Sequence, residues 1–498
     1  MTNKVVLFYP PYAGQPLGPP LSLLSLASPL LQEGFQVSIV DGSIQPDFRR
    51  LVSQEIKDAL CLGVSLLTGQ MIRPAVEVAR LVRQLRPGLP IVFGGWHPSL
   101  LPAQTLNKSF VDIIVRAQGE RTLVELARLL SEGKPLHAVS GISHKLDGGI
   151  HHNPERSVAN VNDLPTPAFN LGNFDAYERI TGIRKLPYAS SVGCPYACNY
   201  CTDQVFYKRR FNAYTVDRVV TEVTELVSRY RISEVAFLDS NFPVNVKRAV
   251  EIARGFLESK VRFRWTFQAS TDLLSRMSDD DVRLLGESGV THMGFGTESA
   301  SQSVLTLMNK KHQRIDEMYE TARKSELAGI RVTFNLILGY PGETEADRLT
   351  TFRIMSDIAR KHSNVSFSPN VFTPYPGIPI WPELRLKGVH EPQSLEEWAN
   401  VDLGSNHLPW LLGEELRRLK RMLEYFLLNN QIRRTAARAP WIRGGVRRAL
   451  GAPLRWRLQR NHYGFPWELW LARTTERLVT RRSLLTGQSL GHGMQEVC

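Results

Sequence analysis

Short apolar runs rich in β-branched residues alternate with helix-period segments over the first 145 residues. In the helical segments apolar residues recur at intervals of three and four, whereas the shorter runs have the length of strands. Strands that alternate with helices in this way form a parallel, doubly wound sheet with ligand sites at its carboxyl edge. The predicted strands are Val5–Tyr9, Val37–Asp41, Cys61–Leu66, Ile91–Gly95 and Ile113–Ala117, and the predicted helices are Ser22–Gln32, Pro74–Arg86 and Thr122–Glu132.

A second series of strand and helix segments begins after residue 180. Between the two series, the stretch from His144 to Phe174 holds several glycines and prolines and little periodicity, which indicates a linker on the surface. In the second series the helix Arg218–Tyr230 carries an apolar face. Six such units indicate a partial barrel of the TIM type, whose chemistry lies at the carboxyl ends of the strands. The predicted strands are Tyr188–Val192, Glu234–Leu238, Arg264–Gln268, His292–Gly296, Arg331–Leu338 and Val365–Val371.

The pattern therefore predicts an α/β protein with a Rossmann-like, doubly wound parallel-sheet domain and a partial (β/α)6 barrel. The segment Glu414–Asn429 places apolar residues on one helical face, which we expect to pack on the barrel. No run of eighteen apolar residues occurs and no secretory signal is recognisable, so we expect a cytoplasmic protein without a membrane span. The predicted boundaries are 1–145 for the Rossmann-like domain, 146–180 for the linker, 181–400 for the barrel and 401–498 for a helical, Arg- and Trp-rich C-terminal region.

The formal net charge of +13 is concentrated near the C-terminus. Residues 431–498 contain thirteen Arg, no Lys and three Glu, with Trp residues among them, and the rest of the chain is close to neutral. Basic segments with Trp suit an anionic membrane surface or RNA, and they also occur in helical caps whose arginines are simply solvated. Three interpretations of this region stay open: a solvated cap, a peripheral contact with the inner face of the membrane, and a nucleic-acid contact.

Three of the five cysteines lie within eight residues, directly after a predicted strand. Cys194, Cys198 and Cys201 are spaced by three and then two residues, so one loop can wrap three thiolates around one corner of an iron–sulfur cube. A structural zinc site prefers four ligands in paired knuckles, and no second Cys or His pair of that kind occurs. Three thiolates leave one iron of a [4Fe-4S] cluster open to a small molecule. Cys61 lies in an apolar run and is expected to be buried.

This cysteine pattern, with the aromatic Tyr200 before the last Cys, resembles the radical S-adenosylmethionine superfamily. The resemblance implies that S-adenosyl-L-methionine binds the open iron, and that one electron from the cluster cleaves it to a 5′-deoxyadenosyl radical. It also implies contacts to this cosubstrate from later strand ends. These are Asp239 or Ser240 near the amino group, Glu298 near the ribose and Gly339 beside the adenine.

The N-terminal sheet resembles the cobalamin-binding domain of one large branch of this superfamily. Small residues at strand ends carry the likeness, because they let a broad corrin approach the backbone. The D-x-H-x-x-G motif that supplies an axial His to cobalt in many cobalamin proteins is absent after Asp41, so the lower cobalt ligand stays unassigned. No G-x-G-x-x-G follows the first strand, which disfavours a nucleotide-binding domain. The residues assigned to cobalamin are Ser65, Thr68, Gly94, Gly95, His97, Gly119 and Glu120, with His97 expected as a hydrogen-bonding residue.

Together the resemblances predict a cobalamin-dependent radical enzyme, in the first place a C-methyltransferase acting on an unactivated carbon of a small-molecule or lipid-like substrate. They imply one cosubstrate molecule to methylate cobalt and a second to generate the hydrogen-abstracting radical, with an external one-electron donor such as flavodoxin or ferredoxin. The first alternative is a cyclase, oxidative or ring-rearranging enzyme in which cobalamin transfers no methyl group.

Two further classes of function compete with the cobalamin-dependent enzyme. An RNA-modifying methylthiotransferase would resemble enzymes with a second cluster on three N-terminal cysteines, and only Cys61 precedes Cys194. Nucleic acid is therefore not an expected partner. A non-enzymatic iron–sulfur sensor is disfavoured by the ordered cosubstrate motifs.

Overall fold

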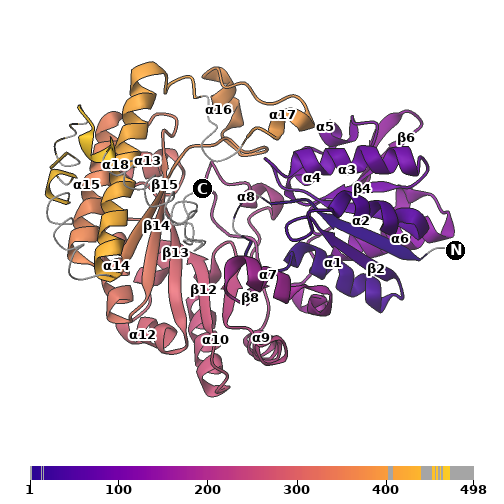
Figure 1. The fold of residues 1–498 in the computed structure, drawn as a ribbon, viewed down its shortest axis with the longest axis horizontal. Helices are drawn as coiled ribbons and strands as arrows, with labels where there is room; N and C mark the ends of the chain where they lie inside the picture. The colour runs from indigo at the N-terminus through magenta and orange to yellow at the C-terminus, as the bar shows by residue number, and fades with distance from the viewer. Residues whose placement is uncertain are drawn as a thin grey trace, which may run out of the picture.

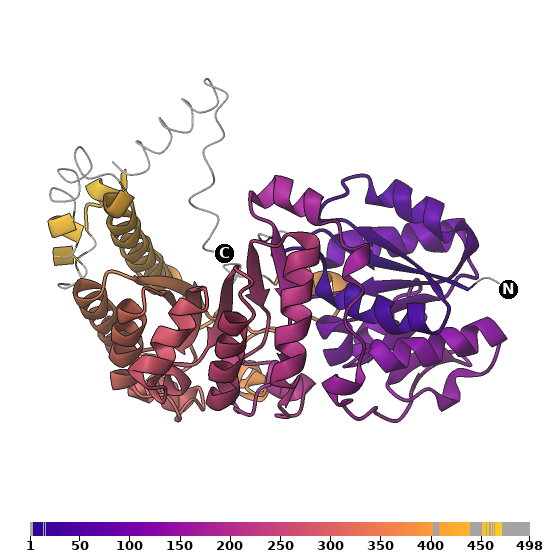
Figure 2. The same cartoon turned by 90° about the horizontal axis from the view of Figure 1, so that it is seen from below.

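Two lobes lie side by side, and a long helix covers the edge of the second lobe that is remote from the first (Figures 1 and 2). The computed structural model describes residues 3–12, 14, 16–401, 408–438, 451–454, 456–457, 460, 462 and 464–470. The first lobe contains a seven-stranded sheet and the second a six-stranded sheet. The predicted α/β class and the order of the two parts are confirmed.

The N-terminal lobe is a sheet in the order β2-β1-β3-β4-β5-β6-β7. Its strands are β1 (Lys4–Tyr9), β2 (Gln36–Asp41), β3 (Ala59–Ser65), β4 (Ile91–Gly94), β5 (Ile113–Val115), β6 (Ile142–Leu146) and β7 (Gly149–His152), and its main helices are α1 (Leu21–Gln32), α2 (Phe48–Glu55), α3 (Ile72–Leu85), α4 (Trp96–Leu100) and α6 (Glu120–Glu132). Alternate residues of β1 enter different cores, because Val5 and Leu7 pack with α1 and α6 whereas Val6 and Phe8 pack with α2 and α3. Strands buried on both faces need no polar alternation, which explains the continuous apolar runs.

Two antiparallel strands extend this sheet beyond the five predicted ones. β6 pairs antiparallel with β5, and β7 pairs antiparallel with β6. The stretch from His144 was expected to be a surface linker, so this part of the prediction is wrong for residues 144–152. β7 is a mostly exposed edge strand and the β6–β7 turn contains two glycines, so the segment shows neither the apolar run nor the alternation of a strand.

The second lobe is built on a parallel sheet in the order β15-β14-β13-β12-β11-β8, which confirms the six-unit partial barrel. Its strands are β8 (Lys185–Tyr188), β11 (Glu234–Phe237), β12 (Arg264–Ala269), β13 (Val290–Glu298), β14 (Arg331–Leu338) and β15 (Val365–Val371). The first strand was predicted three residues too late. Residues Ser191–Val192 form β9 and pair instead with β10 (Asn212–Ala213). The chain leaves the sheet there because the amide and hydroxyl of Ser190 bind the side chain of Asp239.

Helices cover one face of this sheet, and the opposite face is polar and partly open. The covering helices are α9 (Val216–Tyr230), α10 (Val246–Glu258), α12 (Asp279–Glu287), α14 (Ile315–Leu327) and α15 (Glu345–Lys361). Along β14, Val332 and Phe334 are fully buried, whereas Thr333 and Asn335 are half-buried. This period of two leaves hydrogen-bonding side chains on the concave face of the partial barrel.

A segment after β15 bridges the two lobes (Figure 1). It contains α16 (Trp381–Leu386) and α17 (Leu395–Trp398), and α17 packs against α3 of the N-terminal lobe. Glu396 forms ion pairs with Arg80, at 3.3 Å, and with Lys108. Trp398 is fully buried beneath this contact. The bridge therefore ties the carboxyl end of the barrel to the N-terminal sheet.

The C-terminal helix α18 (Gly413–Arg438) packs on the barrel, as predicted. The ring of Phe426 lies 5.0 Å from those of both Phe352 and Phe367. Further along the chain, Arg457 forms a buried ion pair with Glu468 at 2.6 Å. Most of the arginines of residues 431–498 lie outside the described residues. Within the part of the chain that the structure describes, no helix has the length and apolarity to cross a bilayer.

Candidate functional site

The three cysteines lie on one loop between β9 and α8 (Asp203–Phe206). All three are free thiols, with Cys198 buried and Cys194 and Cys201 half-buried. The amide of Cys201 donates to the carbonyl of Cys198 at 3.1 Å, which closes a tight turn. Gly193 enters the loop with φ 77°, and a Cβ at this position would clash with the carbonyl of Arg210. Only glycine fits this entrance.

The donor set fits a [4Fe-4S] cluster better than a single metal ion. Among the residues that the structure describes, no three His, Cys, Asp or Glu side chains converge where one ion could bind. A cubic cluster instead needs thiolates arranged around a larger body. Burial raises the pKa of Cys201 to about 12 and also raises the pKa of Cys194 and Cys198. The thiolate forms therefore need the positive charge of bound iron.

Tyr200, Glu298 and Lys310 form a buried polar cluster behind the cysteine loop. The Tyr200 hydroxyl donates to Glu298 at 3.0 Å and accepts from the Lys310 ammonium at 3.3 Å, which lies 3.7 Å from the same carboxylate. Burial raises the pKa of Glu298, and Lys310 and the Tyr200 hydroxyl offset part of that shift. The end of β13 is thus fixed to the cysteine loop, and Glu298 keeps acceptor capacity for a ligand hydroxyl.

Asp239 and Ser240 follow β11, and both are already engaged. Asp239 is buried and accepts hydrogen bonds from the amide and hydroxyl of Ser190 at 3.0 and 2.7 Å, and from Ser191. Ser240 is exposed and donates to Asp203 at 2.8 Å. Asp239 therefore holds the chain between β8 and β9 in place. A direct contact from either residue to the cosubstrate stays a prediction.

Gly339 begins the loop after β14 and is held on both sides. Its amide donates to Glu343, and its carbonyl accepts from the indole of Trp410 at 2.9 Å. It has φ 76°, and a Cβ there would clash with Leu411. Arg348 pairs with Glu343 at 3.6 Å and with Glu415 of α18 at 2.6 Å. The segment before α18 thus packs directly on the loop expected to lie beside adenine.

At the N-terminal sheet, the turn after β4 has no room for side chains. Gly95 has φ 93°, and a Cβ there would lie 2.8 Å from the carbonyl oxygen of Leu66. His97 is fully buried, and its Nδ1 lies 3.0 Å from the Thr68 hydroxyl. Burial lowers the pKa of His97 to about 3. The ring is therefore neutral, and it lies 6.0 Å from the ring of Trp398. A contact from His97 to cobalamin stays a prediction.

The remaining assigned positions lie at neighbouring strand ends. Ser65 lies 3.3 Å from Ser22 between their hydroxyl oxygens, and a Cβ at Gly119 would lie 2.9 Å from Leu26. Glu120 opens α6, and burial raises its pKa. Gly94 ends β4 beside Gly95. Gly94, Gly95 and Gly119 thus lie at the carboxyl edge of the sheet, where residues without side chains suit the approach of a broad cofactor such as a corrin.

One aromatic stack joins this edge to the cysteine loop. Trp96, directly after the glycine pair, stacks on Phe206 with ring centroids 4.2 Å apart and meets the edge of Tyr207 at 5.9 Å. Phe206 ends α8, the helix that follows Cys201. The expected cobalamin edge and the expected cluster loop therefore belong to adjoining surfaces of the two lobes.

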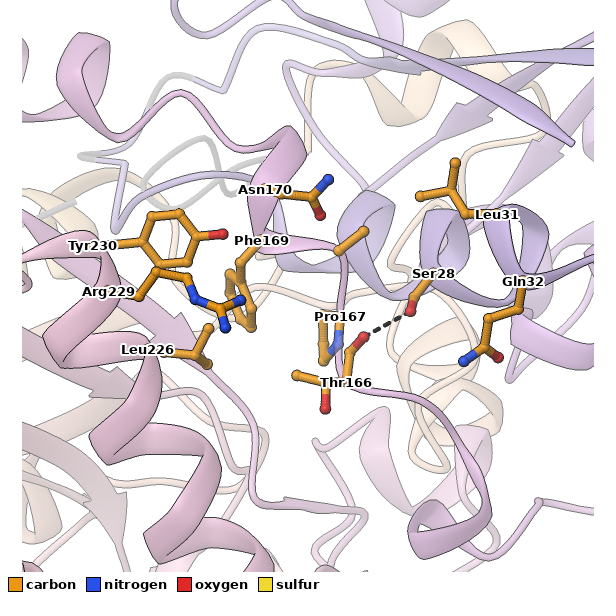
Figure 3. A pocket seen from close by; sticks show the side chains of 11 residues that line it. Ser28, Leu31, Gln32, Thr166, Pro167, Phe169, Asn170, Leu226, Arg229 and Tyr230 are labelled. Atoms are coloured by element: carbon orange, nitrogen blue, oxygen red, sulfur yellow. Dashed lines mark hydrogen bonds between the residues drawn. The ribbon is translucent and has the colours of Figure 1, made fainter. Parts of the chain in front are cut away.

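A surface groove of about 410 Å³ lies elsewhere, between α1, the linker and α9 (Figure 3). Leu226 and Arg229 lie on the barrel side, and Ser28 donates to the carbonyl of Thr166 across the groove at 2.7 Å. None of its lining residues is a candidate site residue. The groove lies where the two lobes meet. The candidate residues at the ends of the strands, and not this groove, indicate the functional site.

Sequence reasoning missed several residues that complete the site. Lys310 stands in an Asn-Lys-Lys turn that looks like ordinary surface, and Trp410 lies far along the chain from Gly339. Asp203, whose buried Oδ2 has no hydrogen-bond partner within the described part of the chain, follows Cys201 by two residues. Its place in the cysteine loop was the one available signal.

Comparison with known proteins gives two family matches. Residues 188–355 match the Radical SAM superfamily, and residues 15–127 match the B12 binding domain. The first range holds all three cysteines and the strand ends from β8 to β14. The second holds the glycine turn after β4 and Glu120.

Relatives and solved structures agree with this domain pair. An uncharacterised methyltransferase of Pyrococcus horikoshii is 29% identical over 73% of this chain and 78% of its own length. The anaerobic magnesium-protoporphyrin IX monomethyl ester cyclase of Rubrivivax gelatinosus is 23% identical over 64% of this chain and 58% of its own.

One similar solved structure is that of the radical S-adenosylmethionine methyltransferase TsrM of Kitasatospora setae, with cobalamin and a [4Fe-4S] cluster bound. Its TM-score is 0.67 at 19% identity, and the match covers 79% of this chain and 76% of the TsrM chain. The cobalamin-dependent S-adenosylmethionine radical enzyme OxsB has a TM-score of 0.70 at 17% identity and covers 92% of this chain and 72% of its own. At these low sequence identities, the structural similarity shows a shared fold.

Proposed function

We propose that this chain transfers a methyl group to an unactivated carbon of a substrate held between its lobes. The reason is that it belongs to the radical S-adenosylmethionine enzymes that carry a cobalamin-binding domain. The observation that carries the proposal is the stack of Trp96 on Phe206, at 4.2 Å. It brings the carboxyl edge of the N-terminal sheet against the helix that follows the cysteine loop. Methyl transfer to a radical needs these two centres to share one cavity.

When bound, the cluster supplies the electron that cleaves S-adenosylmethionine, and cobalamin carries the methyl group. The residues of the chain place and shield these groups. Cys194, Cys198 and Cys201 would hold three irons, and Gly95 lets the turn after β4 pack directly on the backbone of Leu66. The buried Glu298, kept in position by Tyr200 and Lys310, offers a carboxylate oxygen to a ribose hydroxyl.

The first test concerns the cluster. Anaerobically reconstituted protein should bind about four irons. Cys198→Ala should abolish formation of 5′-deoxyadenosine, because the loop then offers two thiolates instead of three. Undiminished cleavage by that variant would overturn the radical assignment.

The second test concerns cobalamin. Protein supplied with hydroxocobalamin should retain it through gel filtration with a base-off spectrum. His97→Asn should leave that spectrum unchanged, since His97 is fully buried and its Nδ1 is paired with Thr68. Histidine ligation of cobalt in the wild type that is lost in His97→Asn would contradict the assignment.

The cyclase alternative rests on the relatives named as cyclases, and the products separate the two functions. Methyl donation by S-adenosylmethionine leaves S-adenosylhomocysteine, whereas radical cleavage leaves 5′-deoxyadenosine. Holoenzyme with reduced cobalamin and S-adenosylmethionine should form both products under anaerobic conditions. Formation of 5′-deoxyadenosine without S-adenosylhomocysteine favours a cyclase or another non-methylating enzyme. The methylthiotransferase alternative loses further support, because Cys61 is fully buried within β3.

The substrate is proposed as a small molecule or a lipid-like compound, reached in the second case by peripheral contact with an anionic membrane. Exposed aromatic side chains support the contact: Trp456 is 50%, Phe465 83% and Trp470 69% exposed. Interfacial Trp and Arg are typical of such surfaces. Against it, Arg457 is folded inward onto Glu468, as in the cap interpretation.

A further inference from the structure

The outer side of the cysteine loop is a thin layer between the cluster position and solvent. Asn309 donates to the carbonyl of Ala197 at 2.7 Å, and Arg209 donates to the carbonyl of Pro195 at 3.2 Å, both in exposed positions. Asn199 donates to the carbonyl of Leu307 at 3.1 Å, also at the surface. Backbone of the loop and these few side chains therefore separate the cysteines from bulk water on this side.

Cations without carboxylate partners gather around this layer. Arg209 and Arg210 lie in the turn after α8, and Lys311 follows the buried Lys310 on the loop that carries Asn309. All three are exposed, and no carboxylate of the described residues lies within ion-pair distance of them. Lys208, by contrast, is paired with Glu155. The surface charge of this patch is therefore positive and not neutralised internally.

Apolar side chains accompany the cations. Leu307 is 44% and Val205 40% exposed, and both lie on the segments that cover the cysteine loop. Apolar side chains with cations on the same segments are typical of brief protein encounters, in which charge steers approach and a limited area is buried. We name Val205, Arg209, Arg210, Leu307 and Lys311 the loop-cover patch.

We propose that the loop-cover patch is the docking surface for an acidic one-electron carrier protein that reduces the cluster. The inference rests on the proposed function, which requires one electron from outside for each cleavage. The patch lies where the protein layer over the cluster is thin, and its unpaired cations suit an acidic partner. A transfer of one electron balances the step: the carrier is oxidised and the cluster is reduced, with no bond made or broken.

The test compares a protein reductant with a chemical one. Reconstituted holoenzyme is reduced with flavodoxin hydroquinone, the probe carrier, or with dithionite, and cluster reduction is followed by its absorbance and electron paramagnetic resonance. The variant is Arg210→Glu with Lys311→Glu, whose side chains form no hydrogen bond or ion pair with any residue that the structure describes. The matched control is Arg229→Glu with Arg254→Glu, two exposed cations on α9 and α10.

The flavodoxin-driven rate should fall roughly tenfold or more in the patch variant, because loss of charge steering acts on association. It should stay within about twofold of wild type in the control, and the wild-type rate should fall with added salt. The dithionite-driven rate should be unchanged in all three proteins. An equal loss with both reductants, an equal loss in the control, or no loss at all would overturn the docking proposal.

Failure of the proposed function has a different signature. In that case wild-type holoenzyme would show cluster reduction by flavodoxin, sensitive to the patch variant, without any formation of 5′-deoxyadenosine. Because cluster reduction is measured before cleavage, the docking surface and the radical chemistry are judged separately. If the patch variant loses binding to RNA or to anionic vesicles that wild type shows, while its flavodoxin-driven rate stays unchanged, the patch belongs to that competitor and the docking proposal is overturned.

Discussion

At the residue scale, the site is arranged by buried polar groups whose charges are balanced locally. Lys310 is the clearest example, because its ammonium lies between a phenol and a carboxylate and its side chain is 6% exposed. Glu298 has the positive φ of 63° at the end of β13, a conformation that its contacts must stabilise. Replacing Lys310 should therefore change both the stability of the fold and the protonation of Glu298.

Lys310→Met should destabilise the fold by about 3 kcal/mol, since a buried carboxylate would lose its cation. Affinity for S-adenosylmethionine should fall roughly tenfold as Glu298 takes up a proton. Thermal unfolding and equilibrium dialysis of anaerobic holoenzyme measure the two effects. Lys311→Met, the exposed neighbour, is the matched control and should change stability by less than about 0.5 kcal/mol. Equal behaviour of the two variants would contradict the role given to Lys310.

Glu343 predicts a pH dependence of stability. Burial raises its pKa to about 7, and Arg348 offsets only part of the effect. An acid with a raised pKa binds more protons when folded, so the free energy of unfolding should fall as pH rises from about 5 to about 8. Glu343→Gln removes this titration, so its unfolding midpoint should gain on wild type across that range. The exposed Glu258→Gln should follow wild type, and a constant gap between Glu343→Gln and wild type would disprove the assignment.

At the element scale, distant segments complete the loops after the strands. The loop that contains Gly339 is closed by Trp410, Leu411 and Glu415, from the segment before α18 and from α18 itself. The loop between α13 (Gln302–Leu307) and α14 covers the cysteines in the same way. The first turn of α18 thus contributes Glu415 to the contacts that hold the loop after β14.

Trp410→Phe should raise the KM for S-adenosylmethionine several-fold and leave kcat nearly unchanged. The reason is the lost hydrogen bond to the Gly339 carbonyl, which contributes about 1 kcal/mol. Steady-state rates with dithionite as reductant give both constants. Trp398→Phe is the control, because the indole N–H of Trp398 has no partner within the described chain. A fall in kcat alone, or equal changes in both variants, would exclude a positioning role for Trp410.

At the scale of the whole molecule, the bridge from α16 to α17 holds the lobes together. Glu396 pairs with Arg80 and Lys108, and Trp398 packs against His97. The lobes therefore meet at their carboxyl edges through charged, aromatic and buried contacts. Helix α18 lies at the edge of the barrel that is remote from the N-terminal lobe (Figure 1).

The exposed aromatics near residue 465 predict binding to anionic vesicles. Full-length protein should co-sediment with them at low ionic strength and be released by salt, because each Arg near such a surface contributes about 1 kcal/mol. Replacing Trp456, Phe465 and Trp470 by Ser should reduce binding, and so should truncation after Arg438. If the intact protein ignores the vesicles, or the truncated one binds equally well, the cap interpretation holds and the substrate need not be a lipid.

The sequence by itself determined the fold class and the position of the cysteine loop, because both depend on local spacing, and the cysteine motif carried the resemblance to the family. Apolar runs separated by helical periods specify parallel strands, and three cysteines within eight residues need no distant partner. The predicted strand ends lie within a few residues of the observed ones. The first barrel strand was misplaced because its end depends on Ser190 and Asp239, which are 49 residues apart.

Only the tertiary structure decided what surrounds these motifs. Lys310 reaches Tyr200 across 110 residues and Trp410 reaches Gly339 across 71. No local pattern marks such pairs, since burial and charge balance exist only once the chain has folded. The same holds for the contact of Trp96 with Phe206, which joins the two lobes, and for the unpaired cations over the cysteine loop. Local periodicity determines which segments form helices and strands, whereas the candidate site forms only where distant segments pack together.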